Sequence, residues 1–203
     1  MEVFAQGIVE VVFGEASRAA RRRRAAAFAA SLGLSFHAEG RPEDIEVSGQ
    51  FDELEMLGVP FVQPVADTFA GGYQGRHVLG FENLIWHKRK RHVPYRFTAV
   101  RLARAVPDLL VASEPPAWFK PDGPCLPVPT PARSSRTVTA ADPASASAVL
   151  AALNGEGPLD RSWMVRANWA VGWHRGRLRT RGEDDAASAL RFLAAAADAC
   201  ERA

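Results

Sequence analysis

Residues 69–103, FAGGYQGRHVLGFENLIWHKRKRHVPYRFTAVRLA, decide the fold of this chain. The stretch predicts three consecutive antiparallel strands, at residues 69–75, 76–87 and 94–103. Apolar residues occupy both alternating sets of positions in the second and third strands, which is typical of a central sheet covered on both faces. Three glycines permit a tight turn or a bulge between the first two strands: Gly71, Gly72 and Gly75.

The first 60 residues predict helices around a short extended segment. Residues 15–32 are rich in Ala and Arg, which are strong helix formers, and Gly33 is a natural helix end. Residues 2–13 mix Val, Ile and Phe with glutamates, and fit either a strand or an amphipathic helix. Residues 34–36 are expected to be extended, and residues 51–57 to form a short acidic helix.

A proline-rich segment divides the chain. Residues 121–135 contain five prolines, which indicates a linker or a wrapping loop. A further strand is predicted just before it, at Leu109 to Ala112. The elements predicted after it are a strand, a helix capped by Asp142 with Pro143 at its first position, a strand pair and a terminal helix, at residues 137–139, 142–153, 160–179 and 183–203.

Together these elements predict an α+β fold, in which helices pack on antiparallel sheet and the chain forms two related halves. Residues 1–120 would be the first half, an N-terminal helix plus a three-stranded meander. Residues 121–136 would be the proline-rich link. Residues 137–203 would be the second half, with strand, helix, hairpin and helix in that order.

The charges of the chain are clustered. With 203 residues and a net charge of +2, the whole surface cannot attract a polyanion, so any electrostatic function must come from local groups. Nine of the 25 Lys and Arg residues lie in two clusters. The clusters are Arg18, Arg21, Arg22, Arg23 and Arg24, and Lys88, Arg89, Lys90 and Arg91.

The sequence predicts a cytoplasmic location, with peripheral membrane association as an open option. The two cysteines, Cys125 and Cys200, have neither metal-ligand spacing nor a disulfide framework. In a signal peptide the cations precede the apolar residues, whereas here the Arg cluster follows them. The sequence has no run of 18 apolar residues, which a transmembrane helix would require.

Several segments resemble a family of uncharacterised bacterial proteins, a domain of unknown function in which many members carry an N-terminal membrane helix. The matching segments are FAGGYQGRHVLGFENLIW, YRFTAVRLARAVPDLLV, RTVTAADPASASAVLAALN and WAVGWHRGRL, within residues 25–200. This chain departs from the family because it lacks the membrane helix, although residues 1–13 occupy the corresponding place. The resemblance implies no catalytic residue, cofactor or ligand.

The basic stretch at Lys88 to Arg91 has three interpretations. Lysine and arginine at a hairpin tip keep it soluble and protect strand edges, and this is the favoured reading. The alternative is contact with an anionic partner, to which Arg21 and Arg24 would contribute if the helix lay beside the tip. A metal site at His87 and His92 is least favoured, because the neighbouring cations repel a divalent ion.

The chain contains no catalytic signature. The GGYQG segment lacks the Gly-Lys-Ser/Thr of a phosphate-binding loop, and no Gly-x-Ser-x-Gly is present near Ser134 and Ser135. An acidic cluster, Asp52 with Glu53 and Glu55, is best read as the solvated face of a helix. The tryptophans Trp163, Trp169 and Trp173, with His174, are expected to be core residues rather than the lining of a ligand pocket.

We therefore predict a non-catalytic binding or accessory module for a protein partner or a membrane surface, without a cofactor or a metal. The alternative is nonspecific nucleic-acid binding through the Arg and Lys clusters, and a weaker alternative is an enzyme with an unrecognised site. Nucleic-acid binding requires that both clusters share one face and that affinity falls steeply with salt. A protein-binding module requires an exposed apolar surface.

Overall fold

The computed structural model describes residues 2–40, 48–59, 65–87, 91–114, 116, 118–119, 121, 123–130, 134–176 and 186–203. The helices in this part of the chain are α1 (Glu2–Ser31), α2 (Ser48–Met56), α3 (Pro143–Ala152) and α4 (Ala186–Arg202), with a short 3-10 helix at Asn154–Glu156. The strands are β1 (Ser35–Gly40), β2 (Val65–Tyr73), β3 (Arg76–His87), β4 (Arg91–Ala112), β5 (Leu126–Val128), β6 (Thr137–Ala140) and β7 (Ser162–Arg175).

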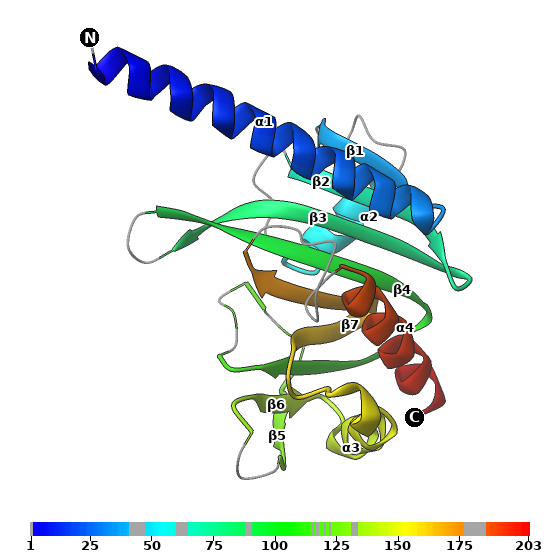
Figure 1. The fold of residues 1–203 in the computed structure, drawn as a ribbon. Helices are drawn as coiled ribbons and strands as arrows, with labels where there is room; N and C mark the ends of the chain where they lie inside the picture. The colour runs from blue at the N-terminus through cyan, green and yellow to red at the C-terminus, as the bar shows by residue number, and fades with distance from the viewer. Residues whose placement is uncertain are drawn as a thin grey trace.

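The described strands form one antiparallel sheet of seven, built around β4 (Figure 1). Strands β1, β2, β3 and β4 follow one another in space as they do in sequence, which confirms the predicted meander. The second part of β4 pairs with β6, which pairs with β5, and β7 pairs with β4 along most of its length. The predicted α+β class, with helices packed on antiparallel sheet, is thus confirmed.

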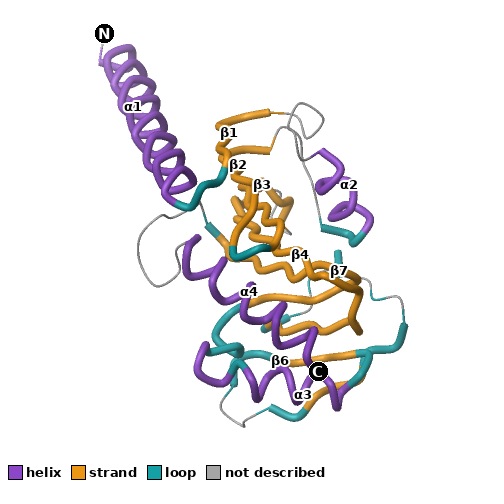
Figure 2. The backbone as a smooth tube through the Cα atoms, turned by 90° about the vertical axis from the view of Figure 1, so that its right-hand side faces the viewer, coloured by secondary structure: helices purple, strands orange, loops and turns teal. Residues whose placement is uncertain are grey.

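Helices cover both faces of the sheet. Figure 2 shows α1 and α4 on one side of the sheet and α2 on the opposite side. The core on the first side joins Ala25 and Ala29 of α1 to Val149 of α3 and Leu190 of α4. The core on the second side is aromatic and lies beneath α2, with its main members at Phe51, Phe81, Phe97 and Trp169. This double cover explains why β3 and β4 are apolar on both faces.

Residues 2–13, which fit either a strand or an amphipathic helix, are helical, and α1 runs from Glu2 without a break. Other elements differ from the sequence predictions. Leu109 to Ala112 is the end of β4 and not a separate strand. The predicted strand pair at 160–179 is wrong for its described part, because Ser162–Arg175 is a single strand. Its pairing with β4 is irregular because β4 has extra residues on both sides of Val106, which faces Ala167, whose φ is 49°.

Strands from both sides of the proline-rich link belong to the same sheet. The link itself contains β5, which pairs with β6 from the segment that follows it. The division into residues 1–120, 121–136 and 137–203, with two related halves, stays a prediction.

Helix α4 is fixed to the sheet by a group of charged residues around Arg76. The Arg76 guanidinium donates to Glu201 at 2.7 and 2.9 Å and to Asp198 at 2.5 Å, and its Nη1 also reaches the carbonyl of Arg101. The hydrogen bond from Arg76 holds the pKa of Glu201 below its ordinary value of 4.5, against the opposing effect of burial. This carboxylate also accepts from the backbone N–H of Ala103 at 2.6 Å. The C-terminal turn of α4 is therefore tied to β3 and β4.

Replacing Gly80 by alanine should destabilise the protein by about 1–3 kcal/mol, because it overpacks the core. Gly80 is the cross-strand partner of Phe69, whose ring is fully buried. A Cβ added at Gly80 would lie 2.0 Å from that ring. Urea unfolding measures the change. Gly72→Ala is the matched control, since nothing lies within 4 Å of a Cβ there. Equal loss of stability in both variants would contradict the packing described here.

Glu201→Gln should lower the free energy of unfolding by about 1–2 kcal/mol at pH 7, because a charge-assisted hydrogen bond is lost. A carboxyl group whose pKa is lowered by folding stabilises the protein fully above its unfolded pKa, and this contribution disappears as the pH falls through the folded pKa. The difference between wild type and variant should therefore shrink below about pH 4.5. Asp198→Asn, at a half-exposed carboxylate, is the control and should cost less. A difference that does not change with pH would contradict this account.

Candidate functional site

The described contacts of helix α1 with the sheet lie in its C-terminal part, from Arg21 onward. Ala25 and Ala29 are buried against the sheet, and the Phe28 ring meets the Phe69 ring edge-on with centroids 5.9 Å apart. The helix ends at Gly33, whose φ of 71° turns the chain into β1. The apolar contact is small, since two of these three side chains are alanines.

An ion-pair cluster lies at the N-terminal end of this contact. Arg21 Nε donates to Asp67 Oδ2 at 3.1 Å, and Arg22 Nε lies 3.8 Å from Asp67 Oδ1. The Asp67 side chain is 0% exposed, whereas those of Arg21 and Arg22 are 22% and 29% exposed. We call Arg21, Arg22 and Asp67 the Asp67 cluster. It joins α1 to the second strand of the sheet.

Asp67 occupies a bulge in β2. Ala66 pairs with Glu82 and Phe69 with Gly80, so β2 has one residue more than β3 in this interval. The φ of Asp67 is 46°, in the left-handed region. That conformation costs roughly 1 kcal/mol or more for a residue other than glycine, although Asp tolerates it better than most. Charge-assisted hydrogen bonds contribute about 1.5–3 kcal/mol each, so the contact with α1 is large enough to offset the cost.

Beyond the Asp67 cluster, α1 leaves the body of the protein. Four successive residues, Ser17 to Ala20, are all exposed. Because successive helical residues are 100° apart, four of them surround the helix, and no described part of the chain covers it at this level. Arg18 is exposed although it belongs to the stripe that continues through Arg22, Ala25 and Ala29. The backbone remains helical from this point back to Glu2 and extends well past the sheet (Figure 1).

We call residues 2–20 the projecting segment. At 1.5 Å per residue it is roughly 28 Å long. The spacing of the sheet-facing stripe, continued toward the N-terminus in the sequence, falls on Phe4, Ile8 and Val11. This apolar spacing is typical of a helix that packs against an apolar surface.

The predicted basic site is only partly described. Arg21 is engaged with Asp67, so it is not a freely exposed cation, whereas Arg24 is exposed on the same helix. Lys88, Arg89 and Lys90 lie outside the described residues. Arg91 is the first residue of β4, and its side chain is likewise not described. That the two basic clusters share one surface therefore stays a prediction.

The hairpin that carries the second cluster is longer than the sequence suggested. Its register continues to the pair His87 and Arg91, whereas residues 87–94 were expected to form the connection. On this extension Leu84 is 49% exposed. The other large apolar side chains that are exposed among the described residues, Met56 and Leu126, lie on different elements.

The tryptophans do not share a pocket. Trp163 is buried with α3 and α4, and its indole N–H donates to the carbonyl of Pro158 at 2.9 Å. Trp169 is buried on the opposite face of the sheet, where it donates to Glu53 Oε2 at 2.8 Å. Trp173 is partly buried on that same face. The core interpretation is thus right for the first two, and a pocket lined by all three is wrong.

The sequence predicted that Glu53 belongs to the solvated face of a helix, and this prediction is wrong for Glu53. It accepts from Trp169 and also from Arg101 Nη2 at 3.1 Å, and so fixes α2 on the sheet. Its neighbours Asp52 and Glu55 are exposed, as predicted. Glu53 is therefore the structural member of this acidic group.

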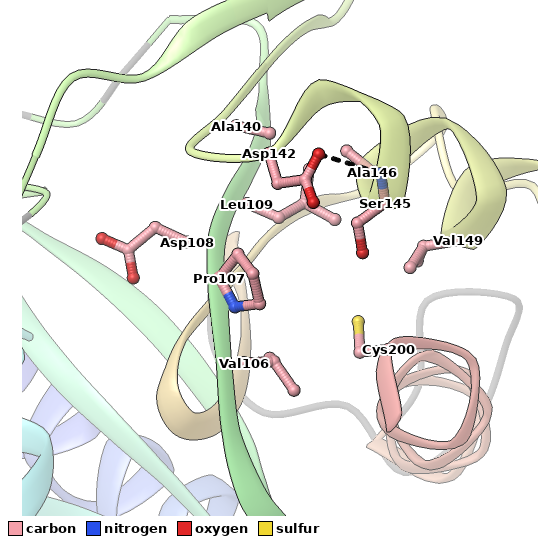
Figure 3. Close-up of a pocket in the computed structure, with 10 residues that line it drawn as sticks. All are labelled: Val106, Pro107, Asp108, Leu109, Ala140, Asp142, Ser145, Ala146, Val149 and Cys200. Atoms are coloured by element: carbon pink, nitrogen blue, oxygen red, sulfur yellow. Dashed lines mark hydrogen bonds between the residues drawn. The ribbon is translucent and has the colours of Figure 1, made fainter. Parts of the chain in front are cut away.

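Neither thiol resembles an activated nucleophile. Burial raises the pKa of Cys200 to about 12, and burial together with the charge of Asp108 raises the pKa of Cys125. A reactive thiol needs the opposite shift. Cys200 borders a small cavity with Ser145 and Asp142 (Figure 3), but its volume of about 10 Å³ is close to the minimum for one water molecule. Asp142 is occupied as the N-cap of α3, where its side chain accepts from the backbone N–H of Ala144 and Ser145.

Metal and membrane sites were also sought in the described part of the chain. No group of three His, Cys, Asp or Glu side chains there is arranged to hold a metal ion. None of the helices there has an apolar stretch of the length that crossing a membrane requires.

Sequence reasoning missed Asp67. The predicted strand begins at residue 69, so Asp67 falls in the segment before it, where an aspartate is an ordinary turn residue. Its role depends on a helix that lies 46 positions earlier in the chain. No local pattern around Asp67 encodes that contact. The signal available in the sequence is the group of arginines on a helix that is otherwise rich in alanine, because arginines next to a packed helix face pair with carboxylates.

Comparison with known proteins relates the chain to a solved structure by its fold alone. No protein-family model matches it, and no curated protein matches it. A similar solved structure is the crystal structure of the mycobacterial trehalose monomycolate transport factor A, TtfA. The TM-score is 0.58 at 14% sequence identity, and the match covers 88% of this chain and 93% of that chain. At this identity the likeness shows a shared fold and nothing further.

Proposed function

We propose that this chain is a non-catalytic accessory module that binds a protein partner through the projecting segment of α1. One observation carries the proposal: the helix is exposed on every side at Ser17 to Ala20 and yet continues to Glu2. A helix without tertiary contacts is marginal in water. A partner that packs on the projecting segment would supply the missing contacts.

The composition of the projecting segment supports this reading. Residues 2–13 are rich in Val, Ile and Phe, which are weaker helix formers than the Ala and Arg of residues 16–31. Their helical state therefore needs packing more than that of the later residues does. An apolar stripe at helical spacing, held in a groove of another protein, is a common mode of peptide recognition.

A protein groove fits the charges better than a lipid surface does. Glu2, Glu10 and Glu15 fall within or beside the apolar stretch, and anionic headgroups would repel them. The exposed arginines at the base of the projecting segment, Arg18, Arg23 and Arg24, match a groove with an acidic rim. We therefore favour a protein partner with an apolar groove bordered by carboxylates.

The comparison with known structures supports an accessory role. The similar structure is described as a transport factor and not as an enzyme. The fold it shares with this chain is therefore compatible with a binding role. The resemblance to a family with N-terminal membrane helices, in the region of residues 1–13, stays a prediction.

The two alternatives from the sequence receive no specific support. Nucleic-acid binding loses one of its proposed contacts, because Arg21 is paired with Asp67. The enzyme alternative has no candidate site among the described residues, where the thiols have raised pKa values and the cavity beside Cys200 is small. Both stay predictions, and the experiment below distinguishes them from the proposal.

A photo-reactive residue placed at Ala19 should capture the partner in cells that produce the protein. Ala148 of α3 is the matched control, since both residues are exposed alanines on helices. We expect one protein adduct of defined mass from position 19 and none from position 148. The captured protein is then purified and titrated, and Ala19→Glu should raise its Kd at least 10-fold, while Ala148→Glu leaves it unchanged.

Other outcomes would count against the proposal. Adducts with lipid or nucleic acid alone at position 19 would favour a membrane surface or the nucleic-acid alternative. Equal labelling from positions 19 and 148 would show that the projecting segment is not a specific site. An adduct with a second copy of the chain would identify the partner as the protein itself, and the titration would then measure self-association.

A further inference from the structure

Few side chains carry the described attachment of α1. Among the described residues, the contact between helix and sheet includes the Asp67 cluster, the alanines Ala25 and Ala29, and the edge-on meeting of Phe28 with Phe69. Alanine side chains bury little apolar surface, so the cluster is a large share of the attachment. It is also the last contact before the helix becomes exposed at Ala20.

The position of Asp67 in the sheet is specific to this contact. An ordinary strand residue at this point would alternate regularly between the two faces, whereas the bulge adds a residue to β2 and places Asp67 against the arginines of α1. Asp67 Oδ1 has no hydrogen-bond donor in the described structure, and Arg22 Nε lies 3.8 Å from it. A buried carboxylate with one accepted side-chain hydrogen bond relies heavily on that bond.

We propose that Asp67 is a positioning residue that fixes the direction in which α1 projects from the sheet. The two arginines are on successive positions of the helix, 100° apart, so a single carboxylate between them resists rotation as well as lifting of the helix. The inference rests on the proposed function, since direction matters only if the projecting segment binds. The Asp67 cluster thus sets the orientation in which the partner meets the segment.

Asp67→Asn tests this inference with little change in shape. Asparagine also tolerates a positive φ, so the bulge is preserved while the charge is removed. The measurement is hydrogen exchange of backbone amides in the purified full chain. Loss of a charge-assisted hydrogen bond should speed the exchange of residues 22–31 about 10-fold and leave the amides of β3 and β4 unchanged. Arg23→Gln removes an exposed charge from the same helix and is the control.

The double variant Arg21→Gln, Asp67→Asn gives a second readout. If the two residues act through each other, it should exchange no faster than Asp67→Asn alone. The inference is overturned if Asp67→Asn leaves the exchange of residues 22–31 unchanged. It is also overturned if the helix and the sheet accelerate equally, since Asp67 would then be a general stability residue.

The partner assay separates this inference from the proposed function. If the wild-type protein forms the adduct, Asp67→Asn should reduce the yield of photo-adduct from position 19 at least 3-fold, because the helix no longer holds one direction. If wild type forms no adduct, the proposed function fails, while the exchange data still decide whether Asp67 positions α1. A full adduct yield from Asp67→Asn would contradict a role of direction in binding.

Discussion

Strand β4 is the constraint on which the rest of this structure depends. It pairs with β3 through one part of its length and with β6 through another, and β7 follows it along the opposite edge. The register shifts in its pairing with β7 lie between Arg101 and Leu109, where β4 bends. Because β4 accommodates the extra residues opposite Ala167, β7 stays paired with it on both sides of the bend. A single continuous strand therefore joins the segments before and after the proline-rich link.

The position of α1 follows from that sheet. The meander places β2 two strands away from β4, and the bulge in β2 turns a carboxylate toward the helix. The helix packs closely because its contact residues are mostly alanines, and the Asp67 cluster marks the point at which contact ends. The body of the protein thus acts as a rigid support for a helix that it covers only in part. This division between support and projecting helix is the physical basis of the proposed binding role.

Much of this fold could be predicted because its signals are local. Apolar residues on both faces of β3 and β4 indicated a covered sheet, and Asp142 with Pro143 marked the start of α3, where the carboxylate does cap the helix. The predicted strand pair at residues 160–179 failed for its described part, because Gly172 lies inside one continuous strand. In the structure its lack of a side chain admits Leu193, which a Cβ would approach to 3.3 Å. The role of Asp67 was out of reach for the same reason, since it depends on a contact across 46 residues.

The most direct test of the account is the amide-exchange profile along α1 in the unmodified protein without a partner. The central claim is that α1 is attached to the sheet from the Asp67 cluster onward and uncovered before it. The account predicts a step in the profile, with residues 25–31 exchanging at least 10-fold more slowly than residues 17–20. A profile without a step, whether the whole helix is protected or none of it is, would contradict the claim.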